Sequence, residues 1–393
     1  TKPAQAEASK SQQDVGGYLQ SKFRNAEVIE SMGMVGHLYR RWAERNAKAM
    51  GAQLNAQEVA GRVTALSKFV RYTQQSLALG GGAVLVIYGE LSPGAMIAAN
   101  VLMTRALAPI DLMVSTWGGF LNAREAFYRL SDLLEAHPMR DVPAMGIVPK
   151  GDVVIQDVVA SAPGRDKPIL QGVSAIMPPG TVTVVLGASG SGKSTLARVL
   201  LGIWPHSAGK VLLDGQPIGK WNRMELGPHI GYLPQDIELF DGTIAENIAR
   251  SGQVESEKVI EAAEAAGLHH MILRFPKGYD TPMGEAGGLL SGGQRQRIGL
   301  ARAMYGMPAL VVLDEPNANL DDEGENALVR AVQGLKAQGK TVVLISHRPG
   351  IVGVADRLLI LQNGTVQASG PRDGVLAALK QQQEEAKAAL SQS

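Results

Sequence analysis

The most informative stretch of the sequence is Gly187-Ala188-Ser189-Gly190-Ser191-Gly192-Lys193-Ser194-Thr195. The apolar run before it, residues 181–186, predicts a buried parallel strand, and residues 196–201 after it predict a helix. A glycine-rich turn between a strand and a helix can curl so that successive backbone N–H groups point at a phosphate, and the helix N-terminus adds its positive end. In such a loop, Lys193 would neutralise β- and γ-phosphate charge and the Ser194 hydroxyl would ligate Mg²⁺. The stretch therefore predicts a site for a nucleoside triphosphate, in preference to an ordinary turn before a helix.

The composition allows a large folded protein and excludes several kinds of chemistry. A length of 393 residues suffices for two or three domains. The 38 Lys and Arg residues balance 37 Asp and Glu residues, so the sequence gives no sign of the broad basic face that a nucleic-acid partner requires. The absence of cysteine excludes disulfides, cysteine-ligated zinc and thiol catalysis. Because the chain begins at Thr1 and shows no signal segment, we expect it to be a processed or truncated form of a longer polypeptide.

The first third of the chain predicts long helices. Residues 1 to about 15 are small and polar, and we expect them to be disordered. Apolar residues recur at threes and fours over residues 17–50, and a second helical stretch begins near residue 55. No charge lies between Arg71 and Glu90, an uncharged length close to the roughly 20 residues that cross a membrane.

A second apolar stretch, residues 95–121, follows a turn at residues 90–94 and is interrupted only by Arg105 and Asp111. We predict a membrane hairpin at about residues 70–121, with both ends cytoplasmic because its flanks carry Arg and Lys and its turn carries a single acid. A soluble apolar helical hairpin is the alternative. In a membrane, Arg105 and Asp111 would face a bundle interior or an aqueous pathway. Since one hairpin cannot enclose a pathway, further helices must come from upstream sequence or from partner chains.

Two further motifs add polar groups to the predicted nucleotide site. The apolar run 310–313 predicts a buried strand that ends in Asp314 and Glu315. There Asp314 would hold Mg²⁺ through water and Glu315 would polarise an attacking water, although an apolar run before two acids is often only structural. The second motif, Leu290-Ser291-Gly292-Gly293-Gln294-Arg295-Gln296-Arg297, opens a predicted helix. It would offer N–H groups and Ser291 to a second phosphate contact, or serve as a plain N-cap.

This second motif resembles the signature sequence of ATP-binding-cassette (ABC) ATPases, and the other markers of that family occur in the expected order. Gln235 resembles the glutamine of the Q-loop. Asp321 ends the segment Asn319-Leu320-Asp321, which is similar to the D-loop, and His347 resembles the switch histidine that reaches the γ-phosphate. Together these motifs cover about residues 150 to 375.

The resemblance implies a domain that hydrolyses ATP with Mg²⁺. It assigns catalysis to Glu315, His347 and Gln235, and Mg²⁺ binding to Ser194, Gln235 and Asp314. It also implies a head-to-tail dimer, in which ATP lies between the phosphate-binding loop of one copy and the signature loop of the other. The implied nucleotide-binding residues are Gly187, Ala188, Ser189, Gly190, Ser191, Gly192, Lys193, Ser194, Thr195, Ser291, Gly292, Gly293, Gln294 and Asp321.

Two positions depart from the family pattern. Ala162 stands where members usually carry an aromatic ring that stacks on adenine. Ala318 replaces a small hydroxyl residue of the D-loop, which removes one hydrogen bond across the implied dimer. We therefore expect base stacking to be weak or supplied by another residue, while the phosphate chemistry is unaffected.

The flanking sequence resembles one subgroup of exporters. Residues 281–287 are similar to a short segment that exporters place before the signature and that importers generally lack. Residues 30–34, 71–80 and 105–110 resemble the last part of the membrane domain of type I protein secretion permease/ATPases. In that family six membrane helices precede the ATPase, and this chain is expected to hold only the final two, which fits an N-terminally truncated chain.

That resemblance implies an inner-membrane homodimer, its ATPase domain cytoplasmic, that exports polypeptides across the inner membrane. The implied partners are a periplasmic membrane-fusion adaptor, an outer-membrane channel protein, the secreted polypeptide and membrane lipid, with no nucleic acid. Two alternatives stay open. One is an ABC exporter of lipid, drug or small peptide, and the other is a soluble ABC ATPase that acts on nucleic acid.

The predicted fold class is an α-helical membrane-domain portion followed by an α/β P-loop ABC nucleotide-binding domain. The helical portion would comprise two transmembrane helices and cytoplasmic helical extensions. The predicted divisions are residues 1–137 for the helical portion, 138–149 for a linker rich in Pro and Gly, 150–380 for the ATPase domain and 381–393 for a polar tail.

Overall fold

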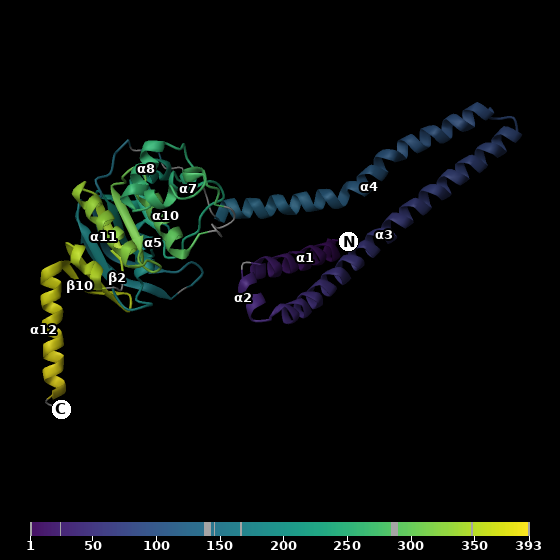
Figure 1. Cartoon of the computed structure of the whole chain (residues 1–393). Helices are drawn as coiled ribbons and strands as arrows, with labels where there is room; N and C mark the ends of the chain where they lie inside the picture. Colours follow the sequence, from purple (N-terminus) through teal and green to yellow (C-terminus); the bar gives the residue numbers. More distant parts are fainter. Residues whose placement is uncertain are drawn as a thin grey trace. The chain divides into compact units, whose positions relative to one another are not determined.

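The computed structural model (Figure 1) describes residues 2–23, 25–136, 143–144, 146–165, 167–283, 290–346 and 349–391. The chain divides into two compact units, Thr1–Met139 and Arg140–Ser393. The first unit is helical, and the second contains all the described strands.

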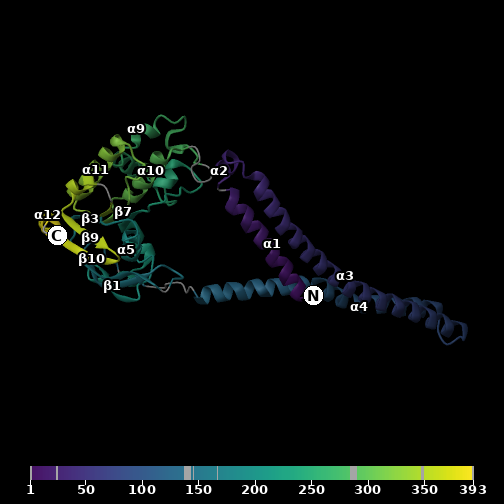
Figure 2. The ribbon, with the colours of Figure 1, turned by 90° about the horizontal axis from the view of Figure 1, so that it is seen from below.

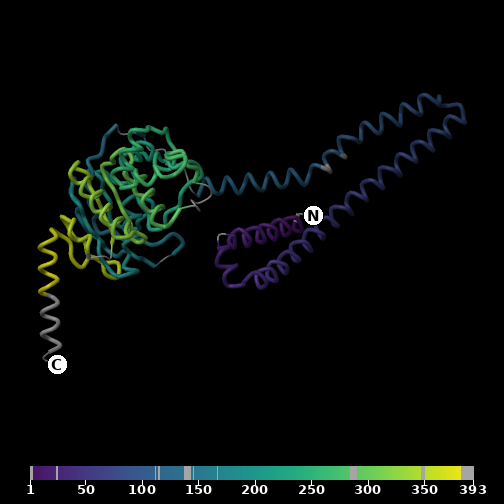
Figure 3. The backbone as a smooth tube through the Cα atoms, viewed as in Figure 1, coloured from purple at the N-terminus to yellow at the C-terminus, as the bar shows by residue number. Residues whose placement is uncertain are grey.

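The first unit is built on two very long helices. Its elements are α1 (Lys2–Phe23), α2 (Ala26–Ser31), α3 (Val35–Ile87) and α4 (Pro93–Ala136). At 1.5 Å per residue, the 53 residues of α3 extend about 80 Å. Figures 1 and 2 show α3 and α4 as an antiparallel hairpin, and Figure 3 traces α3 as one continuous rod. The helical stretch predicted to end near residue 50 and the one predicted to begin near residue 55 are parts of one helix, because α3 continues through Gly51.

The expected disorder of residues 1 to about 15 is also wrong. This segment forms most of α1, which lies along α3 (Figure 2). The Arg45 guanidinium lies 4.6 Å from the centre of the Tyr18 ring, and Val15 and Ala49 are buried. Composition alone suggested disorder, but packing against a neighbouring helix supplies the burial that an isolated polar helix lacks.

The predicted hairpin between residues 70 and 121 has its turn between Ile87 and Pro93. Among the described residues, no helix combines the length and the apolar character needed to cross a bilayer. The two membrane crossings are thus not confirmed. Arg105 lies within α4, and the side chain of Asp111 lies outside the described part of the chain.

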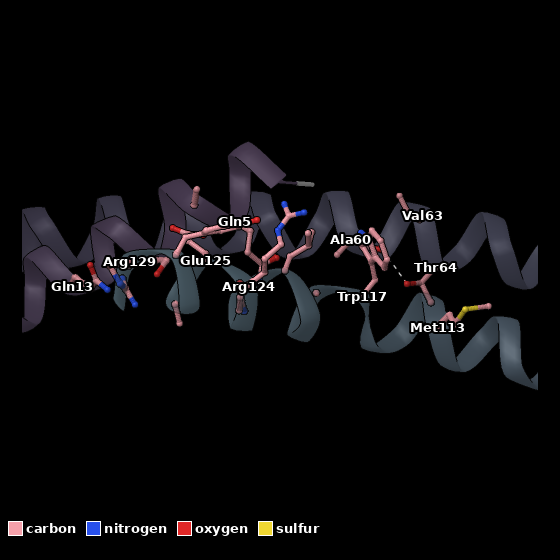
Figure 4. A pocket seen from close by; sticks show the side chains of 17 residues that line it. Gln5, Gln13, Ala60, Val63, Thr64, Met113, Trp117, Arg124, Glu125 and Arg129 are labelled. Carbon is pink, nitrogen blue, oxygen red and sulfur yellow. Dashed lines mark hydrogen bonds between the residues drawn. The ribbon is translucent and has the colours of Figure 1, made fainter. Parts of the chain in front are cut away.

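A cavity of about 1030 Å³ opens among α1, α3 and α4 (Figure 4). Its lining mixes polar side chains, such as Gln5, Arg124 and Glu125, with apolar ones, such as Val63 and Trp117. Large apolar side chains elsewhere on these helices are exposed, among them Leu66, Phe69, Leu102, Phe120 and Phe127. The first unit therefore leaves much apolar surface uncovered.

The second unit holds two sheets. The first has the order β2-β1-β4-β5 and is antiparallel. The second has the order β10-β9-β3-β8-β7-β6, and all its pairs are parallel except β9–β10. The strands are β1 (Val153–Ser161), β2 (Pro168–Met177), β3 (Val182–Leu186), β4 (Ala208–Leu213), β5 (Gln216–Pro217), β6 (Ile230–Leu233), β7 (Leu310–Asp314), β8 (Thr341–Ile345), β9 (Arg357–Gln362) and β10 (Thr365–Pro371).

Helices cover both faces of the parallel sheet, as its Val- and Leu-rich strands require. One core joins α5 and inward-facing residues of both sheets, and the other joins the parallel sheet to α7, α8, α10 and α11. The helices are α5 (Lys193–Leu200), α6 (Arg223–Leu226), α7 (Ile244–Ile248), α8 (Ser256–Ala265), α9 (His269–Ile272), α10 (Gly292–Met304), α11 (Asp322–Ala337) and α12 (Arg372–Ser391). The strands predicted at residues 181–186 and 310–313, and the helix after the glycine-rich stretch, are confirmed.

Candidate functional site

The glycine-rich stretch forms a loop between β3 and α5, at the carboxyl end of a central strand. Ala188, Ser189 and Gly190 are exposed at its rim, whereas Ser191, Gly192 and Lys193 are buried. Gly190 and Gly192 have φ of 79° and 99°, a left-handed conformation that glycine adopts without strain. The loop therefore has the curled backbone that was predicted from its glycines.

Lys193 is the first residue of α5, and its side chain turns back into the loop. Its Nζ donates to the carbonyl oxygens of Gly187 and Ala188, each at 2.9 Å. The residue is only 6% exposed. The ammonium group is thus held inside the loop, where an incoming phosphate would replace the two carbonyls as its partner. Ser194 and Thr195 follow in the first turn of the same helix.

Asp314 lies at the end of β7, two strands from the loop, and is fully buried. In the described part of the chain, neither of its carboxylate oxygens makes a hydrogen bond of ordinary length and angle, although the Ser194 hydroxyl is close enough to stabilise the charged form. Burial raises the pKa of Asp314; the Ser194 hydroxyl, Arg198 and Lys193 act in the opposite direction. A buried carboxylate beside a serine hydroxyl offers the oxygen ligands that Mg²⁺ prefers.

This arrangement predicts that Asp314 lowers stability when no cation is bound. Replacing Asp314 with asparagine should raise the free energy of unfolding by about 1 to 3 kcal/mol in EDTA without nucleotide, because it removes a negative charge that burial disfavours more than its neighbours stabilise it. The matched variant Asp321→Asn removes the negative charge that pairs with Arg297. This substitution should lower the free energy of unfolding by up to about 1 kcal/mol. Denaturant unfolding compares the two; a less stable Asp314→Asn chain would contradict the prediction.

Glu315 and Gln235, which are 80 residues apart, meet at the ends of adjacent strands β7 and β6. The Gln235 Nε2 donates to Glu315 Oε2 at 3.3 Å. Glu315 has φ of 50°, an uncommon value for a residue with a side chain and one that often marks functional sites. Its N–H donates to Ile345 O, and its own carbonyl accepts from Gln296 Nε2. The structure thus brings two of the three predicted catalytic residues together.

The signature loop opens α10, with Ser291 as its N-cap. Ser291 Oγ accepts from the Gln294 N–H at 3.2 Å, and the Gln294 side chain accepts from the Ser291 N–H at 2.9 Å. This capping box is the plain structural role left open by the sequence. The D-loop packs against it: a side chain at Gly293 would lie 2.8 Å from the Asn319 carbonyl oxygen.

Asp321 has partners within its own chain. It is the N-cap of α11, accepting from the Gly324 N–H at 2.9 Å, and it pairs with Arg297 of α10 at 3.1 Å. The D-loop is therefore held against α10, the helix that the signature loop begins, by this ion pair. Because α10 packs on β6, at the edge of the sheet, three strand positions separate this assembly from β3. Because neighbouring strands lie about 4.8 Å apart, these three positions place the signature loop on a different part of the domain from the phosphate-binding loop.

Four further sequence-based expectations concern residues that either lie outside the described part of the chain or show only a local structural role. His347 and residues 284–287 lie outside the described part of the chain. Ala162 directly follows β1 and accepts a hydrogen bond from the Arg165 N–H, so it begins the turn into β2. Ala318 is exposed.

A polar network around the buried Asn247, which joins the Q-loop segment to α10, was not predicted. The Asn247 side chain bonds both backbone groups of Phe240, and its Oδ1 accepts from Arg302 Nη2 at 2.6 Å. Arg302 also donates to the carbonyl oxygens of Glu238 and Asn247. Asn247 and Arg302 are 55 positions apart in sequence, and no local pattern indicates the pairing.

Comparison with known proteins shows which class of protein the second unit and the whole chain resemble. Residues 170–318 match the model of the ABC transporter family. A solved structure described as a bacterial Atm1-family ABC exporter with ATP bound has a TM-score of 0.85 and 25% identity, and the match covers 100% of this chain and 68% of that one. The second unit thus contains an ABC transporter ATPase domain, and the chain has the ABC exporter fold, a helical region followed by the nucleotide-binding domain.

Curated relatives make the assignment more specific. The chain is 44% identical over 375 residues to the type I secretion system ATP-binding protein PrsD of Rhizobium meliloti (strain 1021), a match that covers 95% of this chain and 64% of PrsD. It is 32% identical to the cyclolysin secretion/processing ATP-binding protein CyaB of Bordetella pertussis and to the leukotoxin translocation ATP-binding protein LktB of Mannheimia haemolytica, covering 92% of this chain and 51% of each relative. The chain is a homologue of type I secretion ATP-binding proteins, and it spans between half and two thirds of their length.

Proposed function

We propose that the chain works as the permease/ATPase of a type I secretion system, which hydrolyses ATP to export polypeptides across the inner membrane. The observation that carries the proposal is the phosphate-binding loop with Lys193 turned into it, beside Asp314 and the Gln235–Glu315 pair. This constellation occurs in a chain that is 44% identical to a type I secretion protein.

ATP is the proposed substrate of the site and Mg²⁺ its proposed cofactor. Ser194, Asp314 and Gln235 would hold the cation, which supplies charge neutralisation for the β- and γ-phosphates when it is bound. Lys193 would exchange its two carbonyl partners for phosphate oxygens. Glu315, held by Gln235, would orient the attacking water and take its proton. His347 is proposed to contact the γ-phosphate.

We further propose that two copies are needed to complete the site. The signature loop of one copy (Ser291, Gly292, Gly293 and Gln294) would face the phosphate-binding loop of the other copy. Within one domain the two loops lie apart, because the signature loop begins α10 near the edge strand β6 and the phosphate-binding loop follows the central strand β3. Asp321 would act beside it by holding the D-loop through its cap and its pair with Arg297. A homodimer would therefore contain two ATP sites.

The membrane setting is proposed from the first unit. Its long helices expose many large apolar side chains, which would contact lipid and partner helices. We propose that the protein lies in the inner membrane with its ATPase domain in the cytoplasm. We also propose that it works together with a periplasmic membrane-fusion adaptor and an outer-membrane channel protein. Arg105 would face the transport pathway.

The secretome of cells tests the transport proposal. Cells carrying the wild-type protein in its native length are compared with cells carrying the Glu315→Gln variant at equal expression. Loss of one or a few proteins from the medium supports polypeptide export and identifies the cargo. An unchanged secretome, with the hydrolysis defect verified, would favour export of lipid, drug or small peptide. Release of the native-length protein from membranes by alkali without detergent would favour the soluble alternative.

Restoring an aromatic ring at position 162 should strengthen adenine binding. One base–aromatic stack contributes about 1 to 3 kcal/mol, so Ala162→Tyr should tighten ATP binding by about tenfold if no other residue already covers the base. Tripolyphosphate, which lacks the base, serves as the control ligand and should bind the two chains equally. Equal ATP affinity of both chains, measured by calorimetry, would show that another group already stacks on the base.

A further inference from the structure

The turn between β9 and β10 touches the back of the phosphate-binding loop. Asn363 and Gly364 connect the paired residues Gln362 and Thr365, with φ of 49° and 81°. A two-residue turn with both φ positive is the type I′ hairpin turn, for which Asn-Gly is the preferred sequence. The Gly364 N–H donates to the Ser191 carbonyl oxygen at 3.1 Å. A turn 173 residues downstream of Ser191 thus contacts the loop directly.

We propose that Gly364 is a positioning residue for the phosphate-binding loop, which it holds in the conformation that receives phosphate. The proposal rests on the proposed nucleotide site and adds to it a residue outside the known motif. A trans peptide unit is planar, and its C=O and N–H point in opposite directions. Because Gly364 fixes the Ser191 carbonyl toward the turn, the Gly192 N–H of the same peptide unit is fixed toward the opposite side, where the phosphate would lie.

The turn is itself anchored, so it can act as a fixed support. The Gln171 N–H of β2 donates to the Gly364 carbonyl oxygen at 2.8 Å. A side-chain carbon at Gly364 would lie 1.9 Å from the Ile169 carbonyl oxygen, a backbone atom. Ile169 and Leu170 also lie against Gly192, where an added carbon would meet Leu170 Cδ2 at 2.9 Å. The turn and β2 therefore enclose the loop from behind.

A second contact comes from the strand that leads into the turn. A carbon added at Gly187 would lie 2.3 Å from the Leu361 carbonyl oxygen. β9 also pairs in parallel with β3, whose last residue Leu186 is opposite Ile360. Both ends of the glycine-rich curve are thus backed by residues 361–364. Glycine is required at position 364 because an added carbon would collide with the Ile169 carbonyl oxygen, and the positive φ would also strain a residue with a side chain.

The test compares two glycines in the same kind of turn. Gly215, with φ of 77°, follows Asp214, with φ of 50°, between β4 and β5, and no atom lies within 4 Å of a carbon added there. Gly364→Ala should weaken binding of ADP with Mg²⁺ to the full chain by about tenfold, as expected when one hydrogen bond that orders a site is lost. Gly215→Ala imposes the same backbone strain and should bind ADP as tightly as the unsubstituted chain.

Calorimetric titration of Gly364→Ala, Gly215→Ala and Lys193→Ala with ADP tests the positioning role of Gly364 separately from the proposed nucleotide site. If Gly364→Ala binds ADP as Gly215→Ala does, the positioning role is overturned. If Lys193→Ala also binds normally, the proposed nucleotide site itself fails. Should Gly364→Ala not fold, hydrogen–deuterium exchange of the unsubstituted chain decides: a Gly364 amide protected without nucleotide supports the proposal, and one that exchanges at the rate of an unstructured peptide overturns it.

Discussion

Replacing Lys193 with alanine is expected to reduce nucleotide affinity by at least about 100-fold and to remove measurable ATP hydrolysis. The ammonium group lies inside the loop, 2.9 Å from two carbonyl oxygens that a phosphate would replace. A hydrogen bond to a charged group contributes about 1.5 to 3 kcal/mol, and Lys193 would make such bonds to both the β- and γ-phosphates. Calorimetric titration with ADP and a phosphate-release assay measure the two effects.

The matched control is Lys258→Ala. Lys258 is exposed and pairs with Glu255 on the surface, at 2.8 Å, where solvent screens the ion pair. This variant should bind and hydrolyse nucleotide as the unsubstituted chain does. Tight ADP binding by Lys193→Ala would mean that the loop is not the nucleotide site, whatever its backbone conformation.

Local sequence sufficed to predict the parts of the site that lie within one short segment. The strand, the glycine-rich curve and the helix around Lys193 are adjacent in the chain, so their pattern can be recognised directly. Likewise, Asp314 was placed at the end of a buried strand by the apolar run before it. In both cases the physical cause, burial of a central parallel strand, acts on the same residues that display the pattern.

Contacts between distant segments could not be predicted from local pattern. The Gln235–Glu315 hydrogen bond requires that β6 and β7 be neighbours, and the support of the loop by Gly364 requires that β9 lie beside β3. Strand order is a property of the whole sheet. The same limit explains the error at residues 1–15, whose polar composition suggested disorder but whose helix is stabilised by packing on α3.

Glu315→Gln is expected to separate ATP binding from hydrolysis. The amide keeps the shape of the carboxylate, so nucleotide affinity should remain within about threefold of the unsubstituted chain. It cannot accept the proton of the attacking water, and a positioned general base contributes about 10² to 10⁴ in rate. The rate of phosphate release should therefore fall by at least about 100-fold.

If two copies enclose ATP as proposed, the same substitution should also stabilise the dimer, because the γ-phosphate that holds the copies together persists. Sedimentation with ATP and Mg²⁺ should show a dimer for Glu315→Gln, and ADP should not produce it. Asp322→Asn is the matched control: this exposed acid is in the first turn of α11, and its loss should leave hydrolysis unchanged. An unaltered rate in Glu315→Gln would remove Glu315 as the base, and a monomer that retains ATP would remove the shared site while leaving the base assignment intact.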